Sequence, residues 1–387
     1  MGAQAATWSG FGRHGMRAAT DHDEGSRMDF VMTLNRHIGQ EIAPGRRNVY
    51  DTRVKPAFEK ENGRAPETRH EVRKAMLKDS YFQYWSHLRL YSQQKSYDER
   101  RLIVDRQLDD LVDHAKPTAK DKGTVDIDPN FEVPMYQKPL DMHWMPGSFF
   151  TEFTENDVSA GAMYDLGGLY IATNNMLGPY NDGAGYAVVS YLREKFPDFT
   201  PESILDEGCT VGSNMLPFKD AWPEAEVHGI DIGAPVLRYG HRRAESLGYD
   251  VHFSQQNAEQ TKYEDGSFDF VVSTMFLHET SYKAVHNIVR EAHRLLKPGG
   301  LMVHVEQPPF KTMTDPFEQH IRDWDTHNNN EPFWGPMHDM DLEDVAVKAG
   351  FAKNDIIQEM IKLITPTAND KYNEGEGAWF VFGAWKR

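Results

Sequence analysis

The segment at residues 204–214 (Ile-Leu-Asp-Glu-Gly-Cys-Thr-Val-Gly-Ser-Asn) constrains the fold more than any other part of this chain. Its apolar start predicts a short buried strand, and Gly208 and Gly212 predict a turn that leads into a helix. Backbone N–H groups point outward at such a junction and can bind a nucleotide-like cofactor. A second short strand at residues 227–231 follows and ends in a carboxylate, Asp231.

The order strand, glycine turn, helix, strand and acidic residue is that of half of a Rossmann-like sheet. The alternation continues toward the C-terminus, with helices expected at 234–247 and 282–296 and strands at 251–253, 268–273 and 301–306. Alternating strands and helices predict an α/β fold with a parallel sheet covered on both faces. The runs 356–364 and 378–385 are joined without a helix, which predicts a terminal antiparallel hairpin at the sheet edge.

Composition divides the rest of the chain into two parts. Residues 1–25 are rich in Gly, Ala and charge, and we expect a poorly ordered arm. Residues 26–183 are expected to be helical at first, with helices near 66–90 and 97–114, and irregular from about residue 117. We expect this region to cover a substrate or to form a dimer. The aromatic residues that suggest a homodimer on its helices are Tyr81, Tyr84, Trp85 and Tyr91.

The overall composition excludes several classes of protein. The net charge of −17 opposes binding to phosphate backbones, so nucleic acid is not expected as a partner. No apolar run approaches the roughly 20 residues that a membrane-spanning helix needs, and the N-terminus does not resemble a secretory signal. The single cysteine, Cys209, cannot form an intrachain disulfide. These features predict a cytoplasmic protein that does not bind a membrane.

Five motifs in order resemble those of class I S-adenosylmethionine-dependent methyltransferases, over residues 185–387. Asp206-x-Gly208-Cys209-x-x-Gly212 resembles the first motif, and Asp231 stands where the family has the acid that ends its second strand. The other three matches are Asn257-Ala258, the strand at 268–273 and the turn at 295–300. The resemblance implies a seven-stranded, Rossmann-like sheet with an antiparallel terminal hairpin at residues 184–387. It also implies S-adenosyl-L-methionine as cofactor and S-adenosyl-L-homocysteine as product.

The resemblance also implies a set of cofactor-binding residues: Asp206, Gly208, Cys209, Gly212, Asp231, Ile232, Asn257, Ala258 and Thr274. Asp231 is expected to accept hydrogen bonds from the ribose hydroxyls, or alternatively to cap the helix at 234. Asn257 would contact the adenine amino group or serve as a turn residue. Cys209 is expected to be a small apolar filler. Thr210 replaces the usual middle glycine, which implies a different arrangement of the methionine tail.

The expected catalytic residues follow the fourth and fifth strands of the family's sheet. His278 and Glu279 form the best acid–base pair by position, because an imidazole titrates near neutral pH. Glu306 is expected to orient the acceptor or to cap a helix, and His278 has the alternative of a packing role. No metal is expected, because Asp341 of the run His338-Asp339-x-Asp341 is predicted to cap the next helix.

The irregular segments are expected to form the pocket for the methyl acceptor. The candidate residues are His143, Trp144, Tyr164, Tyr180, Trp334 and His338, with Tyr170, Asn174 and Asn175 nearby. Aromatic side chains there would exclude water and contact a planar or apolar acceptor. The alternative is that these aromatics hold the helical region against the cofactor-binding domain.

These observations predict a methyltransferase that acts on a small molecule, with base-assisted O-methylation favoured by His278 and Glu279. Methylation of carbon, nitrogen or sulfur stays open. Non-methylating chemistry on the same fold and a non-catalytic interaction role are further alternatives, and Thr210 is the residue that favours the last one.

Overall fold

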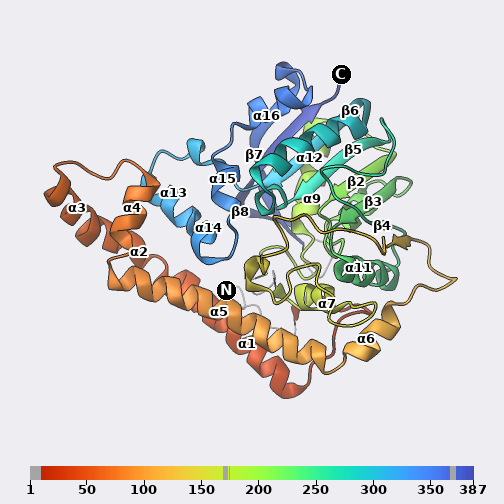
Figure 1. Cartoon of the computed structure of the whole chain (residues 1–387), viewed down its shortest axis with the longest axis horizontal. Coiled ribbons are helices and arrows are strands. Elements are labelled where there is room, and N and C mark those ends of the chain that lie inside the picture. The colour runs from red at the N-terminus through yellow and green to blue at the C-terminus, as the bar shows by residue number, and fades with distance from the viewer. Residues whose placement is uncertain (1–9, 169–172, 174, 367–371) are drawn as a thin grey trace.

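The centre of the molecule is a mixed sheet of eight strands in the order β1-β4-β3-β2-β5-β6-β8-β7 (Figure 1). The computed structural model describes residues 10–168, 173, 175–366 and 372–387. The strands are β1 (Thr124–Asp126), β2 (Ser203–Glu207), β3 (Glu226–Asp231), β4 (His252–Gln255), β5 (Phe268–Thr274), β6 (Leu296–Glu306), β7 (Ile356–Pro366) and β8 (Tyr372–Trp385). All pairs from β1 to β6 are parallel, and β8 pairs antiparallel with β6 and β7. The predicted parallel sheet with a terminal antiparallel hairpin is confirmed.

The sheet has one strand more than the seven expected. β1 comes from the region that was expected to be irregular, and it pairs in parallel with the edge strand β4. Three residues with only one apolar side chain, Val125, give too little periodicity for a strand to be predicted. The sheet therefore receives a strand from outside residues 184–387.

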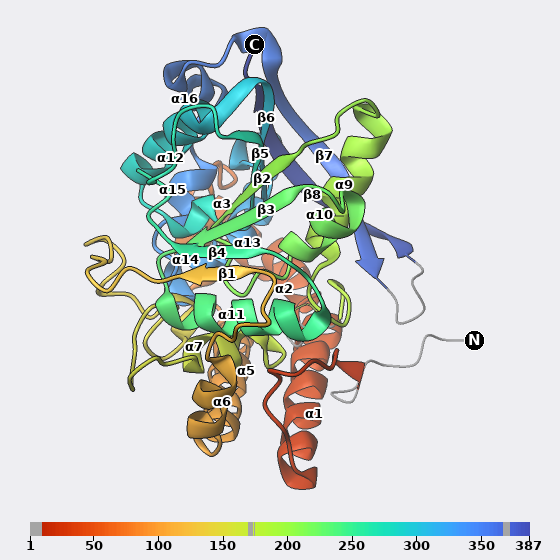
Figure 2. The same cartoon turned by 90° about the vertical axis from the view of Figure 1, so that its right-hand side faces the viewer.

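Helices cover both faces of the sheet, as the buried clusters on its two sides and Figure 2 show. One face packs against α9 (Gly183–Lys195), α10 (Met215–Ala221) and α11 (Ala234–Leu247). The other packs against α12 (Tyr282–Leu295) and α16 (Leu342–Ala349). Apolar residues alternate between these faces along each central strand, so the sheet is buried on both sides.

The N-terminal region is helical, as expected. Its helices are α1 (His22–His37), α2 (Gly45–Val49), α3 (Lys55–Asn62), α4 (Arg69–Met76), α5 (Ser80–Asp105) and α6 (Leu108–Ala115), with π-helical turns at Ile38–Ile42 and Tyr50–Val54. The helix boundaries expected near 66–90 and 97–114 were wrong. Thr68 and Asp79 each cap a helix start by accepting hydrogen bonds from backbone N–H groups, so α4 and α5 are separate and α5 runs unbroken for 26 residues.

The segment after β6 folds back onto this helical region through short helices: α13 (Pro316–Arg322), α14 (Trp324–Asn328) and α15 (Trp334–His338). Trp85 of α5 and Trp324 of α14 meet edge to face, with ring centroids 5.7 Å apart. Both indoles are buried in one cluster, and Trp324 Nε1 donates a hydrogen bond to Ser86 Oγ. The helical region and the C-terminal half therefore share a core (Figure 1).

Residues 10–21 do not form the poorly ordered arm that we expected for residues 1–25. Phe11 and Met16 are buried, and residues 1–9 lie outside the described part of the chain. His14 Nε2 lies 2.7 Å from Asp165 Oδ2 at the end of α7 (Ser159–Asp165). The same carboxylate accepts hydrogen bonds from Tyr239 and Arg243 of α11.

Among the helices that the structure describes, none is both long and apolar enough to cross a membrane.

Replacing Asp165 by Ala should lower the free energy of unfolding by about 3–5 kcal/mol, because it leaves the buried guanidinium of Arg243 without its counter-charge. Burial by itself would raise the pKa of Asp165, but Arg243 and His14 hold that pKa below its ordinary value. Urea unfolding followed by circular dichroism measures the change. The control is Asp113→Ala, which removes an exposed pair with Lys116 and should leave the free energy of unfolding nearly unchanged. Equal effects would contradict this assignment.

Candidate active site

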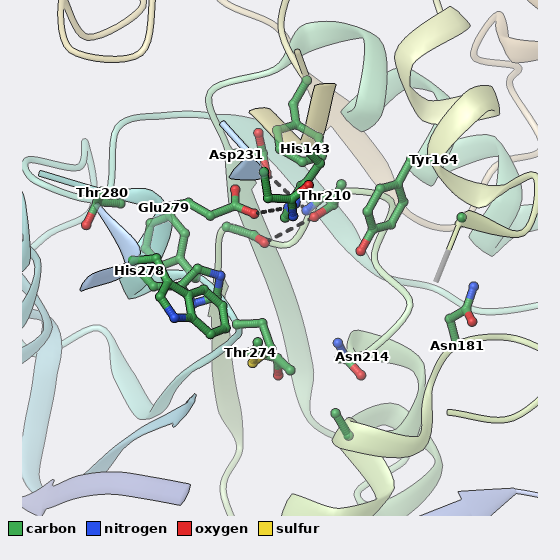
Figure 3. A pocket seen from close by; sticks show the side chains of 18 of the residues that line it. His143, Tyr164, Asn181, Thr210, Asn214, Asp231, Thr274, His278, Glu279 and Thr280 are labelled. Carbon is green, nitrogen blue, oxygen red and sulfur yellow. Dashed lines mark hydrogen bonds and ion pairs between the residues drawn. The ribbon is translucent and has the colours of Figure 1, made fainter. Parts of the chain in front are cut away.

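A cavity of about 410 Å³ lies where the carboxyl ends of the parallel strands face α5 and the irregular segments. Residues at or directly after the carboxyl ends of β3, β4 and β5 line the cavity, with Asp231 and Thr274 among them (Figure 3). Residues of α5 line it as well. In open parallel sheets, ligands bind outside the carboxyl ends of the strands. The cavity therefore has the position that the motifs predict for a cofactor.

The glycine turn after β2 forms one wall of this cavity. Gly208 has φ +69°, and a Cβ there would lie 2.3 Å from the ring of Phe276, so only glycine fits. Thr210 also lies in the left-handed region, with φ +51°. Its N–H donates to Asp231 Oδ2 at 3.0 Å, which holds this sparsely populated conformation in place. Thr210 thus takes the backbone conformation that the usual glycine would favour.

Asp231 ties the turn to the start of α11. Its Oδ1 accepts a hydrogen bond from Gly233 N at 2.8 Å, but Gly233 is the N-cap of α11 and no side chain caps this helix, so the alternative helix-capping role is not observed. Burial raises the pKa of Asp231 to about 6, which leaves the carboxylate ionised at neutral pH. Two of the roughly four acceptor positions of a carboxylate are used by these N–H groups. The remaining positions fit the predicted contact with ribose hydroxyls.

The wall beyond Asp231 is formed by Ile232, Asn257, Ala258 and Thr274. Asn257 Oδ1 accepts from Glu259 N at 2.9 Å, so its alternative role as a turn residue is observed. The buried hydroxyl of Thr274 has no hydrogen-bond partner among the residues that the structure describes. The unpartnered hydroxyl of Thr274 and the amide of Asn257, next to the small side chain of Ala258, fit the predicted site for the cofactor's purine and ribose.

Asp206, Cys209 and Gly212 do not line the cavity. Burial raises the pKa of Asp206 to about 8 and that of Cys209 far above its usual value, so both side chains are neutral at pH 7. The Cys209 sulfur packs against Gly229, where a Cβ would approach it to 2.7 Å. Packing agrees with the predicted filler role of Cys209.

The expected pair of His278 with Glu279 does not form. His278 Nδ1 lies 2.6 Å from Glu306 Oε2, and Glu306 Oε1 accepts from Phe276 N and Leu277 N. Both side chains are buried. Burial lowers the pKa of His278, but the Glu306 carboxylate has the larger effect and raises this pKa to about 9. His278 is therefore an imidazolium at neutral pH, and Glu306 holds it and the loop after β5.

Glu279 pairs instead with His143 from the irregular region (Figure 3). His143 Nε2 lies 2.8 Å from Glu279 Oε1, and its Nδ1 pairs with Glu331. Burial lowers the pKa of His143, but the two carboxylates raise it well above its ordinary value. His143 and Trp144 both have left-handed φ values, of +56° and +60°. Such strain often marks functional sites.

The candidate acceptor-binding residues divide into two groups. His143, Tyr164 and Trp334 line the cavity, whereas Trp144, Tyr180 and His338 do not. Trp144 Nε1 donates to Asn328 O and Tyr180 OH to Arg13 O, so these two aromatics hold segments together, as the alternative predicts. His338 is buried; its pKa is lowered to about 4, mainly by burial. Asn175 does not line the cavity, and Tyr170 and Asn174 lie outside the described residues.

A polar face of α5 also lines the cavity, and the sequence analysis missed it. The residues concerned are Arg89, Ser92, Gln93, Ser96, Tyr97 and Arg100. Arg89, Gln93 and Tyr97 are four residues apart, as are Ser92, Ser96 and Arg100, and this spacing places residues on one face of a helix. A helix face that packs on a core normally carries apolar residues at these positions. Polar residues at these positions could have indicated from the sequence that this face of α5 lines a cavity.

Comparisons with known proteins agree with the fold and the cavity. Residues 204–300 match the family model described as a methyltransferase domain. A demethylmenaquinone methyltransferase of Thermus thermophilus is 35% identical over 109 residues, which cover 28% of this chain and 49% of that protein. A ubiquinone biosynthesis O-methyltransferase of Sodalis glossinidius is 31% identical over 113 residues, 29% of this chain and 44% of that protein. The chain thus spans about half the length of the curated relatives it matches.

Among solved structures, a phosphoethanolamine N-methyltransferase 2 of Haemonchus contortus in complex with S-adenosyl-L-methionine is 18% identical, with a TM-score of 0.39 over 55% of each chain. The sheet and the cavity, together with the family match, define a methyltransferase domain. Residues 204–300 thus match a methyltransferase domain, which supports the resemblance of the motifs to class I S-adenosylmethionine-dependent methyltransferases, and S-adenosyl-L-methionine is the cofactor of that class.

Replacing Asp231 by Ala should weaken binding of S-adenosylmethionine by about 1–3 kcal/mol, because a buried acceptor of hydrogen bonds is lost. Isothermal titration calorimetry measures the affinity. Asp109→Ala, which removes an exposed carboxylate from α6, is the control and should bind the cofactor normally. Unchanged affinity in the Asp231 variant would show that the cofactor site lies elsewhere.

Proposed function

We propose that this protein transfers the methyl group of S-adenosylmethionine to a small molecule held in the same cavity. The observation that carries the proposal is that one cavity joins Asp231 and Asn257, at the cofactor end, to Glu279 and the polar face of α5. When bound, the cofactor supplies a methyl group on a positively charged sulfur, which leaves as a neutral thioether. The chain's own residues need to position the acceptor and accept its proton.

Glu279 is the residue that we propose as the proton acceptor, and an acceptor hydroxyl as the group that is methylated. Apart from Asp231 at the cofactor end, Glu279 is the only carboxylate among the described residues that line the cavity. In this step the O–H bond of the acceptor breaks and its proton moves to Glu279, while the oxygen forms the new bond to the methyl carbon. The neighbouring imidazolium of His143 orients the Glu279 carboxylate.

His278 and Glu306 have a different role in this proposal from the one first expected. His278 lines the cavity but is protonated by its pairing with Glu306, so it can donate a hydrogen bond to a developing anion and cannot accept a proton at neutral pH. Glu306 does not line the cavity and acts through His278 as a positioning residue.

The two curated relatives support a small-molecule acceptor, since one is a demethylmenaquinone methyltransferase and the other a ubiquinone biosynthesis O-methyltransferase. The partly buried pair of Glu279 and His143 favours an acceptor that loses a proton, and hence oxygen over an uncharged amine. Methylation of carbon, nitrogen or sulfur remains the second candidate, because Glu279 would serve any acceptor that carries a proton.

A homodimer through the N-terminal helices stays a proposal with reduced support. Tyr81 donates a hydrogen bond to Ile42 O and Trp85 is buried, so these two aromatics pack within the chain. Tyr84 and Tyr91 remain about half exposed on α5 and support the proposal. A mass in sedimentation equilibrium that stays monomeric at all concentrations would reject it.

The charge of −17 supports a protein without a nucleic-acid partner, and the single cysteine supports a cytoplasmic protein.

Replacing Glu279 by Gln should lower kcat by about 100-fold or more, since a general base contributes roughly 10²–10⁴ to the rate. The affinity for S-adenosylmethionine is measured alongside, because the charge of Glu279 also acts on Asp231 at the cofactor end. The assay measures release of S-adenosylhomocysteine with a panel of phenols, amines, thiols and small acids. Glu264→Gln, which alters an exposed glutamate, is the matched control.

Two results would contradict this proposal in different ways. Full activity of the Glu279 variant would remove Glu279 as the base but leave the methyl transfer intact. Tight cofactor binding without product from any acceptor would instead favour non-methylating chemistry or a non-catalytic role.

A further inference from the structure

Arg100 of α5 is a buried cation without a counter-charge. Its side chain is 2% exposed, Nη1 donates to Met163 O at 2.7 Å, and Nε donates to Ser96 O at 3.1 Å. Across the part of the chain that the structure describes, no carboxylate forms an ion pair with it. The other fully buried arginine of that part, Arg243, pairs with Asp165.

An unpaired buried guanidinium is costly, so its position needs an explanation. Burial lowers the pKa of Arg100, but a guanidinium stays charged in proteins. Two backbone carbonyls and the ring of Tyr97, whose centroid lies 4.0 Å from Arg100 Cζ, stabilise the charge only in part. The chain has 59 acidic residues for 42 basic ones, so a shortage of acidic residues does not explain why Arg100 lacks a carboxylate partner. A ligand that supplies the negative charge explains it.

The surroundings of Arg100 contain further unused polar groups. Ser96 Oγ is buried and lacks a hydrogen-bond partner among the described residues, and the same holds for both side-chain polar atoms of Asn181. Arg100, Ser96 and Asn181 all line the cavity. Buried polar atoms are nearly always hydrogen-bonded in folded proteins. A buried guanidinium without a counter-charge and two side chains with unpartnered polar atoms, all lining one cavity, therefore indicate a binding site.

We propose that Arg100, Ser96 and Asn181 bind a carboxylate of the methyl acceptor, so that the acceptor is an anionic small molecule. That this anion is the methyl acceptor rests on the proposed methyl transfer, whereas the anion-binding site itself rests on Arg100. One unpaired guanidinium balances one negative charge, which favours a carboxylate over a doubly charged phosphate. The other arginine that lines the cavity, Arg89, already pairs with Asp325.

The helix also sets a distance between this site and the proposed base. Gln93 donates a hydrogen bond to His143 O, which places the first half of α5 beside the His143–Glu279 pair. Arg100 follows Gln93 by seven residues, or roughly 10 Å along the helix axis at 1.5 Å per residue. The acceptor should therefore carry its carboxylate and its reacting group at opposite ends of an elongated molecule.

Calorimetry on the full chain saturated with S-adenosylhomocysteine tests this proposal. The probes are 4-hydroxybenzoate, 4-hydroxyphenylacetate and 4-hydroxycinnamate, each compared with its neutral amide. We expect at least one acid to bind about tenfold or more tightly than its amide, since hydrogen bonds to a charged group are involved. Arg100→Gln should abolish this preference, Arg100→Lys should restore part of it, and all variants should bind S-adenosylhomocysteine as the unchanged protein does.

The neighbouring Arg101 provides a matched control. It is exposed on the same helix and pairs with Asp105, so Arg101→Gln removes the same charge outside the cavity and should keep the preference. If Arg100→Gln does not fold, Ser96→Ala replaces it, because alanine favours the helix and removes only an unpartnered hydroxyl. That variant should bind the acid several-fold more weakly and the amide equally well.

The outcomes separate this proposal from the methyl transfer itself. Equal binding of every acid and its amide, or a preference that survives in Arg100→Gln and Ser96→Ala, overturns the carboxylate site even if a neutral acceptor is methylated. Failure of the unchanged protein to bind S-adenosylhomocysteine overturns the proposed function. In that case the preference for acids, measured without S-adenosylhomocysteine, still decides the role of Arg100.

Discussion

The pairing of His143 with two carboxylates is the interaction on which the candidate active site depends. Glu279 follows β5, Glu331 precedes α15, and His143 comes from the irregular region, so one imidazolium joins three segments that are far apart in the chain. Gln93 of α5 donates to the backbone of the same histidine. The His143 side chain is partly buried and Glu331 is buried, so removing one partner leaves an incompletely paired charge, which makes this junction a constraint on the cavity.

A second constraint acts at the cofactor end, where Thr210 occupies a position that usually needs glycine. The left-handed conformation of a residue with a Cβ costs of order 1–3 kcal/mol. The hydrogen bond from Thr210 N to Asp231 offsets part of this cost and also fixes the carboxylate that is proposed to bind the ribose. Thr210 therefore does not argue for a degenerate site, because the turn keeps the conformation and the exposed side of Gly208 that cofactor binding requires.

The sequence predicted the sheet well because its evidence is local. Apolar runs, the glycine turn and Asp231 each follow from residues adjacent in the chain, and the strands β2 to β6 and the terminal hairpin came out as expected. The partner of His278 depends instead on which of two carboxylates, Glu279 or Glu306, the fold brings to its Nδ1. No local pattern carries that information. The polar face of α5 was visible as a pattern, but apolar residues such as Trp85 and Val104 on the same helix dominated its interpretation.

The charges around the cavity differ between its two ends, and this difference suits the proposed reaction. Asp231 lies at the cofactor end with its pKa raised to about 6, so the approach of a cation there favours its ionised form. S-adenosylmethionine carries such a positive charge. At the other end Arg100 presents an unpaired positive charge to the acceptor. A cationic methyl donor and an anionic acceptor are thus each attracted to a different end of one cavity, and the charge arrangement by itself orients the two reactants toward each other.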